Sequence, residues 1–517
     1  MKKSWQISLL LAAQVVTAQR VVQRSVQHFE SPESGPFLPF ITLGFGTPAQ
    51  NITGVFDTGS SDVIIPEAGS AVCRLKTQQC TAPAAVVRGQ FDPEAASDVR
   101  RLAGKRFNAT FGGGDQYDGV YIKTTVTLGN NGAGKVPRAQ VALASHSKPR
   151  SRLPQVPVFG IGPRPNEATE QRYDNLPKKM KVAGTTKSQA YSVVLNATPF
   201  GNGSVFFGGI DRSKFSGQLK AVPLERDNRG EVSEFVVRMS SVKLRLGARR
   251  AVNGSTGGRQ CKGGAGMKPV RTKRAPWARA TSLRRENKAN VWYGKPPNEV
   301  VDERAAAATA AGQVDKHAAA GDGRKSNKNN GGGGGGNRNS TTAAGAEINL
   351  GLDPADGLTL VDTGGVEMGL PAPVLARMAR ALGAAFSERD GLGAVECARL
   401  PGSELVMRFR NDTVEARVPL GNMRVSEALL PDGKALARRG LCVLAVGPAR
   451  PGGLSTATLP FLAAVYTVFD LDNDRLLFAQ ARGDPGAPGG RLEEFPPKKD
   501  SRGKGKKKCT ARKKCSA

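Results

Sequence analysis

Short apolar and β-branched runs recur along most of the chain, and Gly, Pro and Asn separate them. This pattern predicts β-strands. The clearest runs are FLPFITLGFG, VYIKTTVTLG, AYSVVLNATP, GSVFFGGI, FVVRMSSVKLRL and VYTVFDLDNDRLLFAQ. One helix is predicted where apolar residues repeat at helical spacing, at Leu375, Met378, Ala379 and Leu382. Pro373 stands near its start and Gly383 is placed to cap its end. The expected fold class is mainly β, with a few short helices.

Two of the apolar runs end on the same tripeptide, Asp-Thr-Gly. It begins at Asp57 in VFDTGSSDVIIP and at Asp362 in LTLVDTGGVEMGLP. In each copy the Asp follows an apolar strand, the Thr hydroxyl can bond to the opposite loop, and the Gly permits a tight turn. One such tripeptide is typical of an ordinary turn. Two copies in matching contexts predict a duplicated half-barrel, in which each half contributes one loop to a shared cleft.

Two carboxylates in one dry cleft cannot both ionise cheaply. At about 4 Å and an effective dielectric constant near 20, their repulsion is about 4 kcal/mol. That energy separates the two titrations by roughly three pKa units, so one proton is shared over a wide acidic range. The ionised carboxylate can then take a proton from water while the protonated one polarises a peptide carbonyl. This chemistry requires no metal and no cofactor, and we expect neither.

Several stretches match a known family in order. They are VFDTGSSDVIIP, YIKTTVTLG, FGIGPRPNEAT, YDNLP, AYSVVLN, GSVFFGGIDRSKFSGQLKAVPL and TVFDLDNDRLLFAQ. With them the sequence resembles the pepsin-like aspartic proteases, most closely the fungal secreted candidapepsin and yapsin types, over about residues 35 to 245 and 346 to 482. The resemblance implies a bilobal pepsin-like fold with two β-rich lobes around a central cleft. It also implies that Asp57 and Asp362 are the catalytic pair of an endopeptidase that works best at acid pH on extended polypeptides.

The resemblance assigns supporting roles as well. Residues expected to support the catalytic loops are Thr58, Gly59, Ser60, Thr363 and Gly364. The hairpin that covers the substrate would carry Phe111, Gly112 and Gly113, with Phe111 in the place of the family's Tyr. Ile64 replaces the Trp to which that Tyr hydrogen-bonds. Losing both ends of a hydrogen bond is nearly neutral, so we expect these two side chains to pack against each other. Tyr117 is a candidate for the missing hydroxyl.

The second half of the site departs from the family pattern. Gly365 stands where the family has Thr or Ser, which removes a hydrogen bond to Asp362 worth about 1.5–3 kcal/mol. The apolar-apolar-Gly segment behind the first Asp is Val158 to Gly160, but its counterpart is Thr456 to Thr458, followed by Leu459 in place of Asp. We expect Thr458 to push on the Asp362 loop. An active endopeptidase is the favoured interpretation. The alternative is a catalytically impaired homologue that acts as a binding protein.

Several features indicate export. Residues 1–18 read as a signal peptide, with a buried first helix as the alternative. No later run reaches the length needed to span a bilayer. We predict disulfides between Cys73 and Cys80, which bracket a short loop, and between Cys397 and Cys442. Glycosylation candidates are Asn51, Asn108, Asn196, Asn202 and Asn411. We expect a monomer that is secreted, extracellular or associated with the cell wall.

The domain boundaries follow from composition. We assign 19–215 to an N-terminal lobe, 216–246 and 346–485 to a C-terminal lobe, and 247–345 to a disordered basic insert rich in Gly and Ala. Residues 486–517 are predicted to form a disordered basic tail. These two segments carry much of the net charge of +31. Nucleic-acid binding by them is the alternative to solvated charge, and we expect no specific nucleic-acid partner.

Overall fold

The computed structural model describes residues 20–31, 35–75, 80, 89–111, 115–129, 134–148, 156–197, 201–247, 345, 347–449 and 453–497. The predicted signal peptide, nearly all of the insert and the end of the tail lie outside these residues. Strands dominate the described part, which confirms the mainly β prediction. In the part of the chain that the structure describes, no helix is long and apolar enough to cross a membrane.

Strands of the first half follow the apolar runs. They are β1 (Val22–Ser31), β2 (Gly35–Phe45), β3 (Gln50–Asp57), β4 (Val63–Pro66), β5 (Arg100–Thr110), β6 (Gln116–Thr127), β7 (Lys135–Lys148), β8 (Val158–Gly160), β9 (Tyr191–Val194), β10 (Asn202–Phe207), β11 (Gly209–Asp211) and β12 (Phe215–Pro223).

Strands of the second half are shorter on average. They are β13 (Val236–Arg245), β14 (Glu347–Asn349), β15 (Leu358–Val361), β16 (Met368–Leu370), β17 (Phe386–Ser387), β18 (Gly391–Leu392), β19 (Val395–Glu396), β20 (Glu404–Phe409), β21 (Val414–Pro419), β22 (Leu441–Cys442), β23 (Val446–Pro448), β24 (Ser455–Ala457), β25 (Val465–Asp470), β26 (Arg475–Ala481) and β27 (Leu492–Glu494).

Helices are few and short, as expected. They are α1 (Ala71–Arg74), α2 (Leu176–Val182), α3 (Ala372–Leu382), α4 (Gly433–Arg438) and α5 (Leu459–Ala464). The helix predicted from its apolar spacing is α3. It buries the four residues that predicted it, and Gly383 closes it in the left-handed conformation with φ of 68°.

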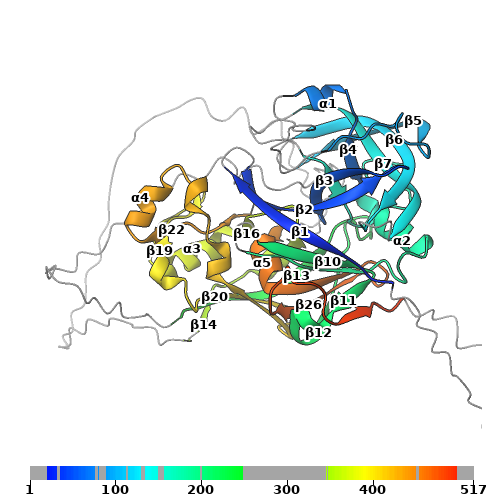
Figure 1. The fold of residues 1–517 in the computed structure, drawn as a ribbon. Helices are drawn as coiled ribbons and strands as arrows, with labels where there is room; N and C mark the ends of the chain where they lie inside the picture. The colour runs from blue at the N-terminus through cyan, green and yellow to red at the C-terminus, as the bar shows by residue number, and fades with distance from the viewer. Residues whose placement is uncertain are drawn as a thin grey trace, which may run out of the picture.

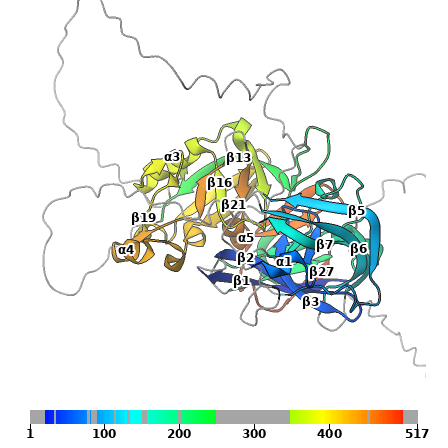
Figure 2. The same ribbon diagram turned by 90° about the horizontal axis from the view of Figure 1, so that it is seen from above.

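Most of the described strands form a large first sheet and a smaller second sheet, and β11-β27, β17-β18 and β19-β22 form two-stranded sheets. The first runs in the order β12-β26-β25-β9-β10-β1-β2-β3-β8-β4-β7-β6-β5, and the second in the order β21-β20-β13-β15-β24-β16-β23. In Figures 1 and 2, β3 to β7 with α1 lie on one side of the molecule, and β16, α3 and α4 lie on the other. This is the predicted bilobal arrangement. Strands β25 and β26, from the end of the chain, join the first sheet beside β9.

One strand path occurs in both halves of the protein. Strand β3 runs parallel to β8, which runs antiparallel to β4, which runs parallel to β7. In the other half, β15, β24, β16 and β23 repeat these relations in the same order. The predicted duplication is therefore present in the backbone pairing. It places the ends of β3 and β15 in equivalent positions.

The predicted disordered tail begins too early in the chain. Strand β27 lies within it and pairs antiparallel with β11, from Gly209 opposite Glu494 to Asp211 opposite Leu492. Phe495 is buried in the small apolar cluster that also contains Ile210. The Gly and Pro content of this stretch obscured a short strand whose apolar residues cover the edge of the first lobe. The folded region extends to at least residue 497.

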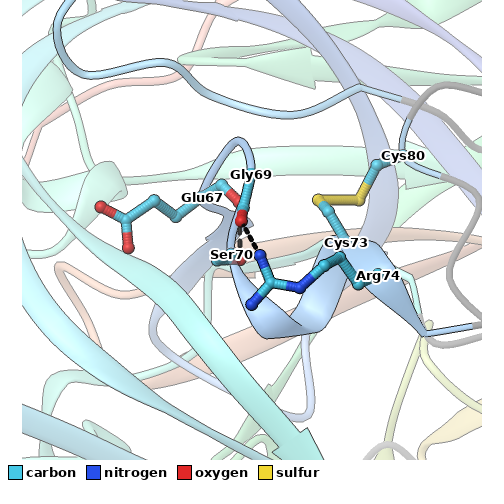
Figure 3. Close-up of a disulfide and its surroundings, with 6 residues drawn as sticks. All are labelled: Glu67, Gly69, Ser70, Cys73, Arg74 and Cys80. Atoms are coloured by element: carbon cyan, nitrogen blue, oxygen red, sulfur yellow. Dashed lines mark hydrogen bonds between the residues drawn. A yellow bond between two sulfur atoms is a disulfide. The ribbon is translucent and has the colours of Figure 1, made fainter.

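Both predicted disulfides are present. Cys73 bonds to Cys80 and Cys397 bonds to Cys442, with Cα atoms 5.5 and 5.1 Å apart. Figure 3 shows the first, at the end of α1, where the Arg74 guanidinium donates to the carbonyl of Gly69.

The glycosylation candidates lie at the protein surface. Four are exposed and one is half-buried: Asn51, Asn108, Asn202 and Asn411 are exposed, and Asn196 is intermediate.

The ring of Phe56 should be an important support for the first Asp loop. It is fully buried and meets the rings of Tyr191 and Phe207 edge-on, each with a centroid distance of 6.0 Å. We expect Phe56→Ala to lower the free energy of unfolding by about 3–5 kcal/mol, because the cavity adds to the lost apolar burial. Denaturant titration measures this. Val182→Ala, at a side chain that is 59% exposed, is the control and should change it by less than about 0.5 kcal/mol. An equal effect of both substitutions would contradict the prediction.

Candidate active site

The two Asp-Thr-Gly loops meet where the lobes join. Thr58 and Thr363 exchange hydrogen bonds across the junction: each backbone N–H donates to the other residue's hydroxyl, at 2.9 and 3.0 Å. Each hydroxyl then donates to a carbonyl of the strand leading into the opposite loop. Thr58 donates to Val361 at 3.2 Å, and Thr363 donates to Phe56 at 2.6 Å. Both threonines are buried, so this reciprocal network fixes the two loops relative to each other.

Each loop also orients its own carboxylate. The N–H of Gly59 donates to Oδ1 of Asp57 at 2.9 Å, and the N–H of Gly364 donates to Oδ1 of Asp362 at 2.7 Å. A Cβ at Gly59 would lie 2.8 Å from Oδ1 of Asp362, and one at Gly364 would collide with Oδ1 of Asp57. The glycine of each loop is therefore packed against the acid of the other. Any side chain there would push the carboxylates apart.

The carboxyl groups of Asp57 and Asp362 are in contact. They share a side-chain hydrogen bond, which requires a proton on one of them. Their exposed fractions are 0% and 1%. Burial raises the pKa of Asp57 well above its ordinary value, and the charge of Asp362 raises it further. Hydrogen bonds from Ser60 and Gly59 lower the pKa of Asp57 and so offset part of this rise.

Comparison with known proteins gives this geometry a context. The profile of the eukaryotic aspartyl protease family matches residues 40–253 and 338–481, which together make up more than half of the chain. The chain belongs to the eukaryotic aspartyl protease family. The unmatched stretch between the two ranges falls inside the predicted insert.

Fungal proteins are among the curated relatives of this aspartyl protease chain. Over 216 residues it is 32% identical to the probable aspartic-type endopeptidase OPSB of Arthroderma benhamiae, covering 41% of each chain. It is 33% identical over 187 residues to secreted aspartic protease 6 of Candida albicans, covering 36% of this chain and 42% of the relative. Secreted aspartic protease 1 of Candida albicans is 32% identical over 201 residues, with 39% and 47% covered. These alignments span less than half the length of each relative.

The two loops of this aspartyl protease differ at the residue that follows Asp-Thr-Gly. In the first loop, the Ser60 hydroxyl donates to Oδ2 of Asp57 at 2.5 Å. In the second, the corresponding residue is Gly365, which has no side chain. We expected Thr458 to push on the second loop. However, the bonds around Thr363 and Gly364 have lengths similar to those of the first loop, so the loop keeps its geometry.

The expected packing of Phe111 against Ile64 is consistent with the structure. Both side chains are buried in one apolar cluster with Val158. Tyr117 lies in the same cluster, edge-on to Phe111 with a centroid distance of 5.8 Å. Its hydroxyl donates to the Val156 carbonyl at 2.9 Å, so it already has a structural partner. Gly112 and Gly113 lie outside the described residues.

Sequence reasoning missed a buried polar cluster behind the first loop. The cluster is centred on Asp62, whose Oδ1 accepts from the hydroxyls of Tyr121 and Tyr173 at 2.7 and 2.8 Å. Its Oδ2 accepts from the Ala168 N–H at 2.6 Å. Burial raises the pKa of nearby Glu167 to about 8, with a further contribution from the charge of Asp62. The signal was available in the sequence: an acid only five residues after Asp57, directly before the apolar run Val63–Pro66, must have buried partners.

Two further residues near Asp57 were missed. The Asn166 side-chain amide donates to the Gly59 carbonyl at 3.1 Å, which braces the turn of the first loop. The Tyr191 hydroxyl donates to the Ile161 carbonyl at 3.1 Å. Burial raises the pKa of Tyr191 well above its ordinary value, and the Asp57 charge adds to the effect. No local pattern marks either residue, because each reaches the loop from a distant segment.

The raised pKa of Asp57 predicts a pH-dependent stability. A carboxyl whose pKa is higher in the folded state stabilises the fold fully below its unfolded value of 3.8, and this contribution is lost as pH rises through the folded value. Asp57→Asn removes the buried charge. We therefore expect the variant to have a Tm several degrees above wild type at pH 7, and the difference to shrink towards zero below about pH 4. Calorimetry across this range measures it.

Asp356→Asn, at an exposed carboxylate, is the matched control and should follow wild type at every pH. A constant difference in Tm between Asp57→Asn and wild type from pH 3 to pH 7 would contradict the prediction.

Proposed function

We propose that this chain is a secreted aspartic endopeptidase that hydrolyses peptide bonds by activating one water between Asp57 and Asp362. The observation that carries the proposal is the contact between two buried carboxyl groups that share a hydrogen bond. Family membership and the names of the relatives support the same activity.

The pair supplies both the base and the acid for hydrolysis. The ionised carboxylate accepts a proton from water as the oxygen attacks the peptide carbonyl carbon, and the protonated carboxyl donates a hydrogen bond to the carbonyl oxygen. When the C–N bond breaks, the leaving nitrogen takes a proton from the pair. Because one proton must stay on the pair, activity should be highest at acid pH.

The substrate and location follow from the same features. We propose that an extended polypeptide binds across the junction of the lobes and that the protein works as a monomer. Export is supported by the signal-like N-terminus, by the disulfides and by the relatives named as secreted. All five Asn residues named above are the candidates for glycosylation.

One observation favours a second candidate function. Gly365 has no hydroxyl of its own to donate, and Leu459 replaces the acid that the family has after its apolar-apolar-Gly segment. A site weakened in this way fits a protein that binds peptides without cleaving them.

Cleavage of a denatured protein at pH 3–5 separates these two functions. The proposed endopeptidase should cleave it, and a statine-type transition-state mimic should block cleavage. Asp57→Asn and Asp362→Asn should each lower kcat at least about a hundredfold, because each removes one half of the acid–base pair. Asp356→Asn should retain wild-type activity. A folded wild-type protein that binds the mimic but does not cleave would instead support the binding function.

A further inference from the structure

Thr458 occupies a special position behind the second Asp. In the first lobe, β3 and β8 pair so that Asp57 lies opposite Gly160. In the second lobe, β15 and β24 pair with Val361 opposite Ala457. The Asp362 N–H donates to the Ala457 carbonyl at 3.0 Å, and the next residue is Thr458. Thr458 therefore occupies the same position relative to Asp362 as Gly160 occupies relative to Asp57.

The first lobe shows how little room this position has. A Cβ at Gly160 would lie 2.7 Å from the Ser60 hydroxyl oxygen and 2.6 Å from the carbonyl oxygen of Asp62. A side chain at residue 160 would therefore collide with the Ser60 hydroxyl as well as with the backbone of Asp62. The second lobe has the reverse combination, with no side chain at Gly365 and a threonine at Thr458. In the second lobe the side chain is therefore carried by the residue behind the loop and not by the loop itself.

The side chain of Thr458 carries a hydroxyl. Thr458 is 2% exposed, and its Oγ1 has no hydrogen-bond partner among the residues that the structure describes. Although Thr458 is the N-cap residue of α5, the side chain makes no capping bond. A buried hydroxyl without a partner is destabilising, so it should serve a polar group nearby. In the first lobe, a Cβ at the equivalent residue, Gly160, would lie 2.7 Å from the Ser60 hydroxyl oxygen. That hydroxyl lies 2.5 Å from Oδ2 of Asp57.

We propose that Thr458 is the positioning residue of Asp362 and that its hydroxyl donates to the Asp362 carboxylate through one water, in the role that Ser60 fills directly for Asp57. This inference rests on the proposed function, because it assigns a role in the same carboxyl pair. It also makes positions 365 and 458 interdependent. A side chain at 365 should be tolerated only when residue 458 is glycine.

The proposal predicts how the pair titrates. Among the described residues, the titratable groups at the pair include the two carboxyls themselves and, on β9, the buried Tyr191, whose pKa the Asp57 charge raises. A hydroxyl that donates to Asp362 favours the ionised pair, so its removal should raise the pKa of the acidic limb of activity.

Full-length variants test this assignment. Thr458→Val removes the hydroxyl and keeps the shape. We expect it to lower kcat about tenfold, to leave KM within about twofold, and to raise the pKa of the acidic limb by about one unit. Thr458→Ser keeps the hydroxyl and should follow wild type in all three quantities. A Thr458→Val profile that equals the wild-type profile would overturn the proposal.

A matched pair of double variants decides the question if Thr458→Val does not fold. Gly365→Ser with Thr458→Gly copies the first lobe and should give the wild-type pH profile. Gly365→Ala with Thr458→Gly has the same backbone freedom without the hydroxyl and should show the raised acidic limb. Identical profiles for the two double variants would refute the role of the hydroxyl.

One readout is independent of cleavage. The pH dependence of binding a statine-containing peptide, measured by calorimetry, reports the titration of the carboxyl pair in each variant. If wild type binds without cleaving, the proposed function fails, yet a shifted binding profile in Thr458→Val still supports the assignment of Thr458. If wild type cleaves and neither profile shifts, the assignment fails and the proposed function stands.

Discussion

The contact between the carboxyl groups of Asp57 and Asp362 is the interaction on which the rest of the structure depends. Two buried acids can touch only if the chain holds them there and one proton stays between them. Gly59 and Gly364 leave the space for this contact, since a Cβ on either would strike the opposite carboxylate. The threonine exchange then supplies the rigidity, because each lobe's hydroxyl bonds to the backbone of the other lobe.

This arrangement explains why the fold is built from two similar halves. An acid at the end of an apolar strand needs a second strand beside it, and β8 and β24 provide that support in the same parallel register. Next to the first loop, the ring of Phe56 on β3 packs edge-on against the ring of Tyr191 on β9. The first loop is also braced by polar contacts, including the amide of Asn166. The side-chain contacts around the two acids therefore differ, although the strand pairing behind them is the same.

The sequence predicted the features that depend on local patterns. The mainly β fold, helix α3, the paired tripeptides and both disulfides could be read from spacing and repetition. The partners of Asp62 could not, because Tyr121 and Tyr173 reach it from 59 and 111 residues away. Strand β27 was missed for a similar reason. Its few apolar residues become interpretable only once β11 is known to present an uncovered edge.

The departures at Gly365 and Thr458 show why spacing alone misjudged the second loop. Read separately along the chain, each looks like damage: a lost hydroxyl in one place and an unwanted side chain in another. The strand register makes Thr458 the counterpart of Gly160, and in the first lobe a Cβ at Gly160 would lie against the Ser60 hydroxyl. The hydroxyl that is missing at Gly365 and the hydroxyl that is present at Thr458 can then be understood as one substitution of position. What matters for Asp362 is whether a hydroxyl occupies that space, and the chain can supply one from either side of the loop.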